Sequence, residues 1–264
     1  MRKISEAALR SLNAENIEEK VAFTHEGSSA WFDGDLVNEF NCNAPKRPGR
    51  PEKPELLSPH NMPKRRKAKS NAGRIAMLHA IAHIELNAID LAWDMVLRFG
   101  KDMPKEFIDD WVKVADDEAR HFKILNDLLI EMDSFYGALP AHDGLWQSAE
   151  ETAHDLLARL AIVPLVLEAR GLDVTPTLIN KFNSAGDQKS VSALEIIYRD
   201  EIDHVRAGQR WFHYLCEKKT LDPQKTYQEL VNKYFKGSLK PPFNKQARDA
   251  AGFEEDYYLP LVTS

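Results

Sequence analysis

Helix-type spacing of apolar residues runs through the middle of this 264-residue chain. From about residue 71 to 218, apolar positions recur every three or four residues, and strand-like alternation is almost absent. Capping residues and glycines divide this stretch into four helices, which we expect at about 71–99, 104–137, 148–185 and 187–216. Turns at Gly100 and Gly186 join them in pairs. The pattern therefore predicts an all-α protein built on a four-helix bundle of two antiparallel hairpins.

The third of these helices contains residues that disturb a helix. Pro164 removes the hydrogen bond to the carbonyl of Leu160, and Gly171–Pro176 should break or kink the helix again. The distortion at Pro164 either makes room for oxygen or a substrate or only curves the bundle, and the sequence leaves both outcomes open.

Both flanks of the bundle are poorer in helix pattern. Residues 1–70 begin with a short helical stretch, Ile4–Glu19, and continue as a strap with six prolines between positions 45 and 63. Residues 219–264 return to short helices and loops. We therefore divide the chain into an N-terminal extension (1–70), a bundle (71–218) and a C-terminal extension packed on the bundle (219–264).

Composition narrows the class of protein without naming a function. A hydrophobic fraction of 43% with 29% charged residues is ordinary for a soluble globular protein, and a net charge of −6 gives no argument for nucleic acid or anionic membrane binding. We find no apolar run of membrane-spanning length and no signal-peptide core in residues 1–20. Cys42 and Cys216 are far apart, which favours a reduced, cytoplasmic setting without membrane partners.

The strongest chemical signal is a Glu-x-x-His motif that occurs twice. Each motif follows a lone glutamate by 33 residues, and the two sets lie 83 residues apart: Glu85 with Glu118 and His121, and Glu168 with Glu201 and His204. The midpoints of Glu85–Glu118 and Glu168–Glu201 fall at residues 101.5 and 184.5, beside the two predicted turns. Each hairpin therefore brings its two glutamates to the same level.

Neighbours at helical spacing place these glutamates on apolar faces. Leu78, Ile81, Ala82 and Ile89 surround Glu85 in this way. An unpaired buried carboxylate costs several kcal/mol, so four of them need neutralising cations. Two divalent metal ions supply four positive charges; the alternatives are buried salt bridges or surface charges. Glutamate and histidine ligands favour iron, allow manganese and suit zinc less well.

This arrangement resembles the ferritin-like di-iron carboxylate superfamily, in which Glu and Glu-x-x-His alternate on four helices. The resemblance implies six metal ligands, which are Glu85, Glu118, His121, Glu168, Glu201 and His204. Segments 79–86, 117–121 and 48–54 are similar to the bacterial family known as domain of unknown function 455. That family implies the fold and the metal site but no substrate.

Other residues near the motifs are secondary candidates. The resemblance pairs Asp117 with His204 and Asp200 with His121 as hydrogen-bond acceptors that orient the rings, although both aspartates could be ordinary surface acids. His79, His83 and Tyr198 are candidates for extra ligands, proton carriers or a radical relay, and packed core residues are the favoured alternative.

Several functions stay open at this stage. The first is an oxidoreductase that activates dioxygen or peroxide, as a hydroxylase, monooxygenase or peroxidase acting on a small molecule or RNA. Two cysteines cannot form a rubredoxin-like centre, so it would need an external electron donor. The alternatives are a metal-stabilised interaction protein, with a homodimer contact through the extensions, and iron binding without turnover. The basic run 64–69 is either an RNA contact or a solvated linker.

Overall fold

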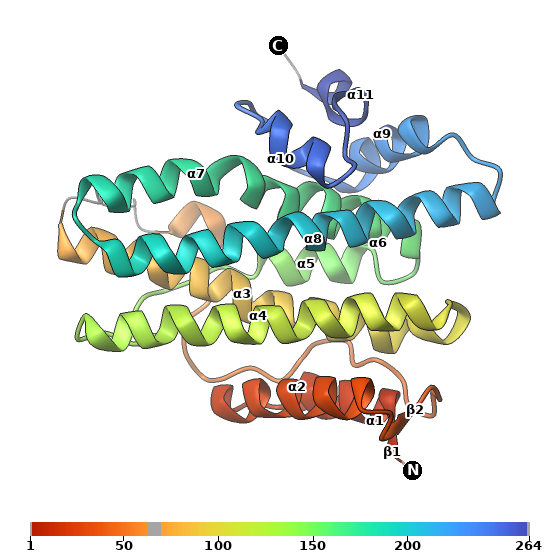
Figure 1. Ribbon diagram of the computed structural model, residues 1–264, viewed down its shortest axis with the longest axis horizontal. Coiled ribbons are helices and arrows are strands. Elements are labelled where there is room, and N and C mark those ends of the chain that lie inside the picture. Colours follow the sequence, from red (N-terminus) through yellow and green to blue (C-terminus); the bar gives the residue numbers. More distant parts are fainter. Residues whose placement is uncertain (1, 63–69, 263–264) are drawn as a thin grey trace. The chain divides into compact units, whose positions relative to one another are not determined.

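Helices make up most of the chain in the computed structural model, which describes residues 2–62 and 70–262 (Figure 1). Among the described residues, the two named strands are β1 (Arg2–Lys3) and β2 (Leu36–Val37), which pair in parallel. The all-α prediction is confirmed. The basic run 64–69 lies outside the described residues.

The chain forms two compact units. Unit 1 comprises residues 1–146 and 184–193, and unit 2 comprises residues 147–183 and 194–264. Each unit contains one lone glutamate and one Glu-x-x-His motif together with the extension nearest to it. The division into two extensions and a bundle stays a prediction.

A long hairpin forms the centre of unit 1. Helix α3 (Asn71–Phe99) begins where the Ser70 side chain accepts a hydrogen bond from the Gly73 N–H, as the sequence predicted, and a 3-10 turn (Gly100–Asp102) joins it to α4 (Lys105–Glu131). The two helices pack along each other. Helix α4 ends six residues before the predicted end at Gly137, because Asp133 adopts a left-handed backbone with φ 57°.

The N-terminal extension contains more helix than its sequence pattern indicated. Two helices, α1 (Ile4–Asn13) and α2 (Ile17–Phe32), replace the single predicted stretch that ended at Glu19. Asn16 starts the second one, since its side chain accepts from the Glu19 N–H. Both helices pack on the α3–α4 hairpin.

The proline-rich strap follows these helices and returns along them. Its described residues, 38–62, hold one 3-10 turn (Pro59–Asn61) and no α-helix. The Gly49 N–H donates to the Leu12 carbonyl at 2.7 Å, and a side-chain carbon at Gly49 would lie 2.5 Å from the Asn13 carbonyl oxygen. Glycine therefore lets the strap reach the end of α1.

A distorted helical run leads through unit 2. It begins with α5 (Gly144–Glu151) and α6 (Leu156–Ile162), passes through a π-helical segment (Val163–Glu168), and continues as α7 (Ala169–Ser184) and α8 (Gln188–Lys218). The predicted distortion at Pro164 is confirmed. Both predicted turns are present. The 3-10 turn Gly100–Asp102 follows α3, and Gly186, with φ 75°, lies just before α8.

The helix does not break at Gly171–Pro176, because α7 continues through it. The other predicted outcome there, a kink, stays a prediction. Pro176 cannot donate to the Leu172 carbonyl, which lies four residues before it. The Asn244 side-chain amide donates to that carbonyl instead, at 3.1 Å. Asn244, 68 positions after Pro176, thus gives the Leu172 carbonyl the hydrogen bond that the proline cannot donate.

The C-terminal extension folds onto the same unit. It consists of α9 (Pro223–Tyr234), α10 (Lys245–Ala250), α11 (Glu255–Tyr258) and a final 3-10 turn (Leu259–Leu261), and α9 packs against α6. Tyr227, Phe253, Tyr257 and Tyr258 make a buried aromatic cluster among these helices.

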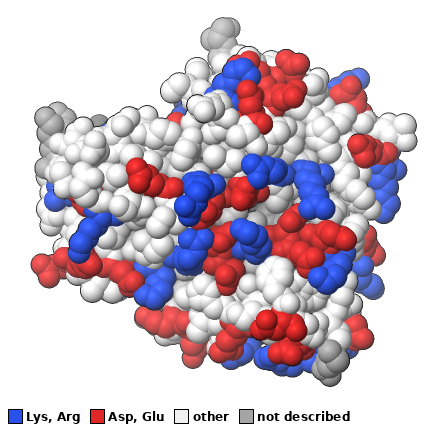
Figure 2. Space-filling model, in the orientation of Figure 1, with Lys and Arg blue, Asp and Glu red and all other residues white. Residues whose placement is uncertain are grey.

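One helix has the length and composition of a membrane span. This candidate covers Asn71–Asp102, and 72% of its most apolar window is buried, which is consistent with the core helix of a soluble protein. Polar residues such as Glu85 and Asp90 interrupt this segment, so the sequence shows no unbroken apolar run of that length. Charges of both signs alternate over the face drawn in Figure 2. Along α4, opposite charges four residues apart form ion pairs, such as Lys113–Asp117 and Lys123–Asp127.

Candidate metal centre

Unit 1 gathers three metal-ligating side chains inside its hairpin. Glu85 comes from α3, and Glu118 and His121 come from α4; their exposed fractions are 2%, 1% and 0%. Ligand atoms of the three lie within 4.8 Å of one another. His121 Nδ1 lies 3.2 Å from Glu85 Oε2 and 3.5 Å from Glu118 Oε2. These residues, here named the unit 1 triad, can hold a metal ion.

Electrostatics in this triad favour a bound cation. The pKa of Glu85 is raised to about 8, chiefly by burial and next by the charge of the neighbouring Glu118 carboxylate, while a hydrogen bond with His121 opposes the shift. Without a nearby cation, one of the two carboxylates in this apolar core therefore tends to keep its proton, and a bound metal ion would allow both to be charged. Two carboxylates and one imidazole form a donor set that fits iron or manganese.

Unit 2 carries the matching residues, here named the unit 2 triad. Glu201 and His204 lie on α8 and are 8% and 1% exposed, with His204 Nδ1 3.8 Å from Glu201 Oε2. Glu168 is the last residue of the π-helical segment and is half-buried. Within each unit the helical spacing that the sequence indicated is thus realised: motif residues three positions apart emerge on one helix face.

The aspartates before the two motif glutamates have cationic neighbours on their own helices. Asp117 accepts from Lys113 at 2.6 Å and from Arg120 at 2.7 Å, and Asp200 accepts from Arg199 at 3.3 Å. Their predicted hydrogen bonds to His204 and His121 stay a prediction.

His79 and His83 are buried and bind the loop that follows α4. The Gly137 N–H donates to His79 Nε2 at 2.9 Å, His83 Nδ1 lies 2.7 Å from the Tyr136 hydroxyl, and the Tyr136 ring stacks on both imidazoles. Burial lowers the pKa of each histidine to about 4. Both rings are therefore neutral at physiological pH. In unit 2, the Tyr198 hydroxyl accepts from the Asn244 amide at 2.7 Å.

Sequence reasoning missed a buried ion cluster on the other side of α3. Asp90 is fully buried, and it meets Lys20 of α2 at 2.5 Å and Arg50 of the strap at 3.2 Å. Arg50 also donates to Asn87, which in turn donates to His83. Polar residues at positions 83, 87, 90 and 94 of an otherwise apolar helix were the available signal, since this spacing lines one helix face.

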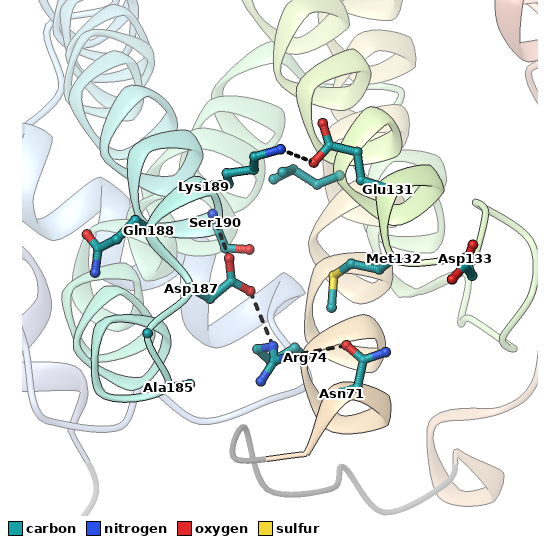
Figure 3. A pocket seen from close by; sticks show the side chains of 12 residues that line it. Asn71, Arg74, Glu131, Met132, Asp133, Ala185, Asp187, Gln188, Lys189 and Ser190 are labelled. Carbon is teal, nitrogen blue, oxygen red and sulfur yellow. Dashed lines mark hydrogen bonds and ion pairs between the residues drawn. The ribbon is translucent and has the colours of Figure 1, made fainter.

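A cavity of about 560 Å³ opens at the end of unit 1 where α3 and α8 begin and α4 ends (Figure 3). Two ion pairs border it, Arg74 with Asp187 at 3.3 Å and Lys189 with Glu131 at 2.6 Å. The unit 1 triad is not part of its described lining. Arg74 precedes Glu85 by 11 residues on α3, which is about 16 Å along a helix.

Comparison with known proteins agrees with the similarity seen in the motifs. The family described as "Protein of unknown function (DUF455)" matches residues 13–259. The chain belongs to this family. It is also 46% identical over 211 residues to an uncharacterized protein of Haemophilus influenzae, covering 78% of this chain and 73% of that protein. No solved structure matches the chain. Because this family has no established function, the chemistry has to be argued from the residues themselves.

Proposed function

We propose that this DUF455 protein is a ferritin-like dinuclear metal protein, with iron in both positions, and that it acts as an oxidoreductase. Glu85, Glu118 and His121 would hold one ion, and Glu168, Glu201 and His204 the other. The observation that carries the proposal is the unit 1 triad, in which three ligating side chains, each at most 2% exposed, converge. Manganese fits the same donors, and zinc fits them less well.

The chain's own residues would prepare the site in three ways. Burial of the unit 1 triad keeps bulk water away from the donor atoms. Because the pKa of Glu85 is raised to about 8, this carboxyl would release its proton when a cation arrives. His121 would bind through a neutral imidazole nitrogen. Two bound irons would supply reactivity toward dioxygen or peroxide, with electrons from an external donor and a small molecule or RNA as substrate.

Metal content comes first in testing this function. The protein is purified from iron-rich cells, and anomalous scattering is measured at the iron and manganese edges. We expect two ions per chain. Oxygen consumption by the di-ferrous protein in a single turnover then tests the chemistry; a di-ferrous form that reacts with neither oxygen nor peroxide contradicts an oxidoreductase.

Deep burial also favours a second function, in which the metal supports the fold of an interaction or iron-binding protein without turnover. A side chain less than 2% exposed, such as Glu118, offers a substrate little access. The double variant Glu118→Gln and Glu201→Gln separates the two functions. If it loses metal but the cellular phenotype of the wild type persists, the metal does not serve catalysis.

A further inference from the structure

The π-helical segment determines where Glu168 stands. Across Val163–Glu168 the helix widens, and the Ala169 N–H donates to the Pro164 carbonyl, five residues back. Such widened turns hold one residue more than an α-helical turn and are rare in proteins. Glu168 ends the segment, so any return toward α-helical geometry would rotate its carboxylate about the helix axis.

Glycine on α8 makes room for this segment. A side-chain carbon at Gly208 would lie 2.5 Å from Pro164 Cβ and 2.7 Å from Pro164 Cγ, far inside the contact distance of real side chains. Gly208 follows His204 by one helical turn and Glu201 by two, so it lies on the same face of α8. The π-helical segment thus rests against the helix face that carries the two other members of the unit 2 triad.

The C-terminal extension binds backbone carbonyls on both sides of Glu168. The buried Tyr227 hydroxyl of α9 donates to the Leu165 carbonyl at 3.3 Å, and Arg248 of α10 donates to the Ala169 carbonyl at 3.4 Å. Arg248 is fixed in turn by two hydrogen bonds to Asp173, at 2.8 and 2.9 Å. Tyr227 and Arg248 are 0% and 2% exposed, so water does not compete for these carbonyls.

The N-terminal extension makes an equivalent contact in unit 1. Asp90 follows Glu85 by five residues, just as Asp173 follows Glu168 by five. Each aspartate is fully buried at its side chain and paired with cations from the neighbouring extension, Asp90 with Lys20 and Arg50 and Asp173 with Arg248. Asp90 and Asp173 are thus 83 residues apart, like the members of the two triads, and each one anchors an extension to its unit.

From these contacts we propose that the C-terminal extension positions Glu168 as a ligand, with Tyr227 and Arg248 as positioning residues and Gly208 as the contact that seats the segment. The inference rests on the proposed function, because it takes Glu168 as a ligand. It gives the extension a role in the metal site: the extension holds the π-helical segment in the shape that aims the carboxylate.

Cobalt titration of the full-length metal-free protein tests this role. Tyr227→Phe removes one hydroxyl and keeps the ring that packs against Phe212 and Phe253. Tyr257→Phe is the matched control, because its hydroxyl bonds His213 in the same aromatic cluster, whereas the Tyr227 hydroxyl bonds the Leu165 carbonyl of the π-helical segment. Stoichiometry, the affinity for each Co²⁺ and the visible Co²⁺ spectrum are recorded, together with thermal unfolding of the metal-free proteins.

We expect wild type and Tyr257→Phe to bind two Co²⁺ with the same spectrum. Tyr227→Phe should bind the first ion normally and the second about tenfold or more weakly, with an altered spectrum, although both variants unfold at similar temperatures. If wild type binds two ions and Tyr227→Phe matches the control in affinity and spectrum, the positioning role is wrong while the metal site stands. If wild type binds no Co²⁺, the proposed metal function fails and this inference with it.

Gly208→Ala provides an independent variant, with Gly171→Ala as its control, since a side chain at Gly171 meets nothing within 4 Å. Weak binding of the second Co²⁺ by Gly208→Ala alone supports the inference. Equal binding by both glycine variants, with helical circular dichroism retained, overturns it.

Discussion

Glu85 and Glu168 lie at corresponding positions of the two motif sets, but on helices of different geometry. In unit 1, Glu85 lies on a regular α-helix whose partner α4 supplies the rest of the triad, and all three residues are buried. In unit 2, Glu168 ends a π-helical segment and is half-buried. The regular helix presents its glutamate without distortion of its own backbone, although Lys20 and Arg50 also bind it through Asp90. The widened one depends on contacts from α8 and from the C-terminal extension.

From this difference we expect the two triads to differ in how tightly they bind an ion and in how freely their ligands move. The unit 1 triad should bind its ion tightly and with fixed ligands, because rigid helices fix its side chains. In the proposed site, Glu168 would be the ligand most able to change its coordination, because it ends a π-helical segment that contacts from other elements support. Substitutions in each unit test that contrast.

Glutamate-to-glutamine variants compare the triads directly. Glu118→Gln removes a buried charged ligand, and we expect the affinity for the unit 1 ion to fall about 100-fold or more, roughly 2.7 kcal/mol. Glu168→Gln should keep that ion and weaken only the other. Metal content after dialysis, measured by mass spectrometry, distinguishes these results. Loss of both ions in both variants would show that the triads do not act separately.

The buried aspartates that anchor the extensions, Asp90 and Asp173, can be compared in the same way. Asp90→Asn leaves Lys20 buried without its counter-charge, and the free energy of unfolding should fall by about 3–5 kcal/mol. Asp173→Asn should lower the free energy of unfolding by a similar amount, because it leaves the buried Arg248 without this counter-charge. It should also weaken binding of the unit 2 ion. Urea denaturation of the metal-free proteins measures the first effect, and Co²⁺ titration measures the second. Equal Co²⁺ binding by both variants would argue against the contrast between the units.

Glycine substitutions probe how tightly the widened helix is seated. Gly208→Ala should lower the free energy of unfolding by about 1–3 kcal/mol, since Pro164 must move. Gly171→Ala should raise it by about 0.4–1 kcal/mol, because alanine restricts the unfolded chain and finds open space in α7. Denaturant midpoints of both variants check the signs. A neutral Gly208→Ala would mean that the segment yields easily.

Acid should destabilise unit 1 through its buried histidines. The pKa of His79 is lowered to about 4 from 6.5 by burial, so the unfolded chain binds more protons between these values. Stability is complete above pH 6.5 and should fall as pH drops toward 4, by at most about 1.4 kcal/mol per pH unit for this group. His79→Gln should flatten that slope in metal-free protein, measured by urea denaturation at several pH values. An unchanged slope would assign the acid sensitivity to other groups.

Local signals account for what could be predicted of the fold and the site. The Ser70 side chain caps the start of α3, and the backbone of Gly186 forms the turn before α8. Both signals are local, so the start of α3 and the second turn could be predicted. Glu118 and His121 share a face because they are three residues apart on a helix. The end of α4 at the left-handed Asp133 was missed because glycine is the usual signal for that conformation, and the nearest glycine is Gly137.

By itself, the sequence determined the helical class, the limits of α3 and the two Glu/His triads with their 83-residue offset, because capping and helical periodicity act over a few residues. Only the tertiary structure decided that α7 runs through Pro176, that Glu168 ends a π-helical segment and that Asp90 and Asp173 anchor the extensions. Each of these depends on a partner about 40 to 80 residues away, such as Asn244 or Gly208, and no local pattern indicates such a partner.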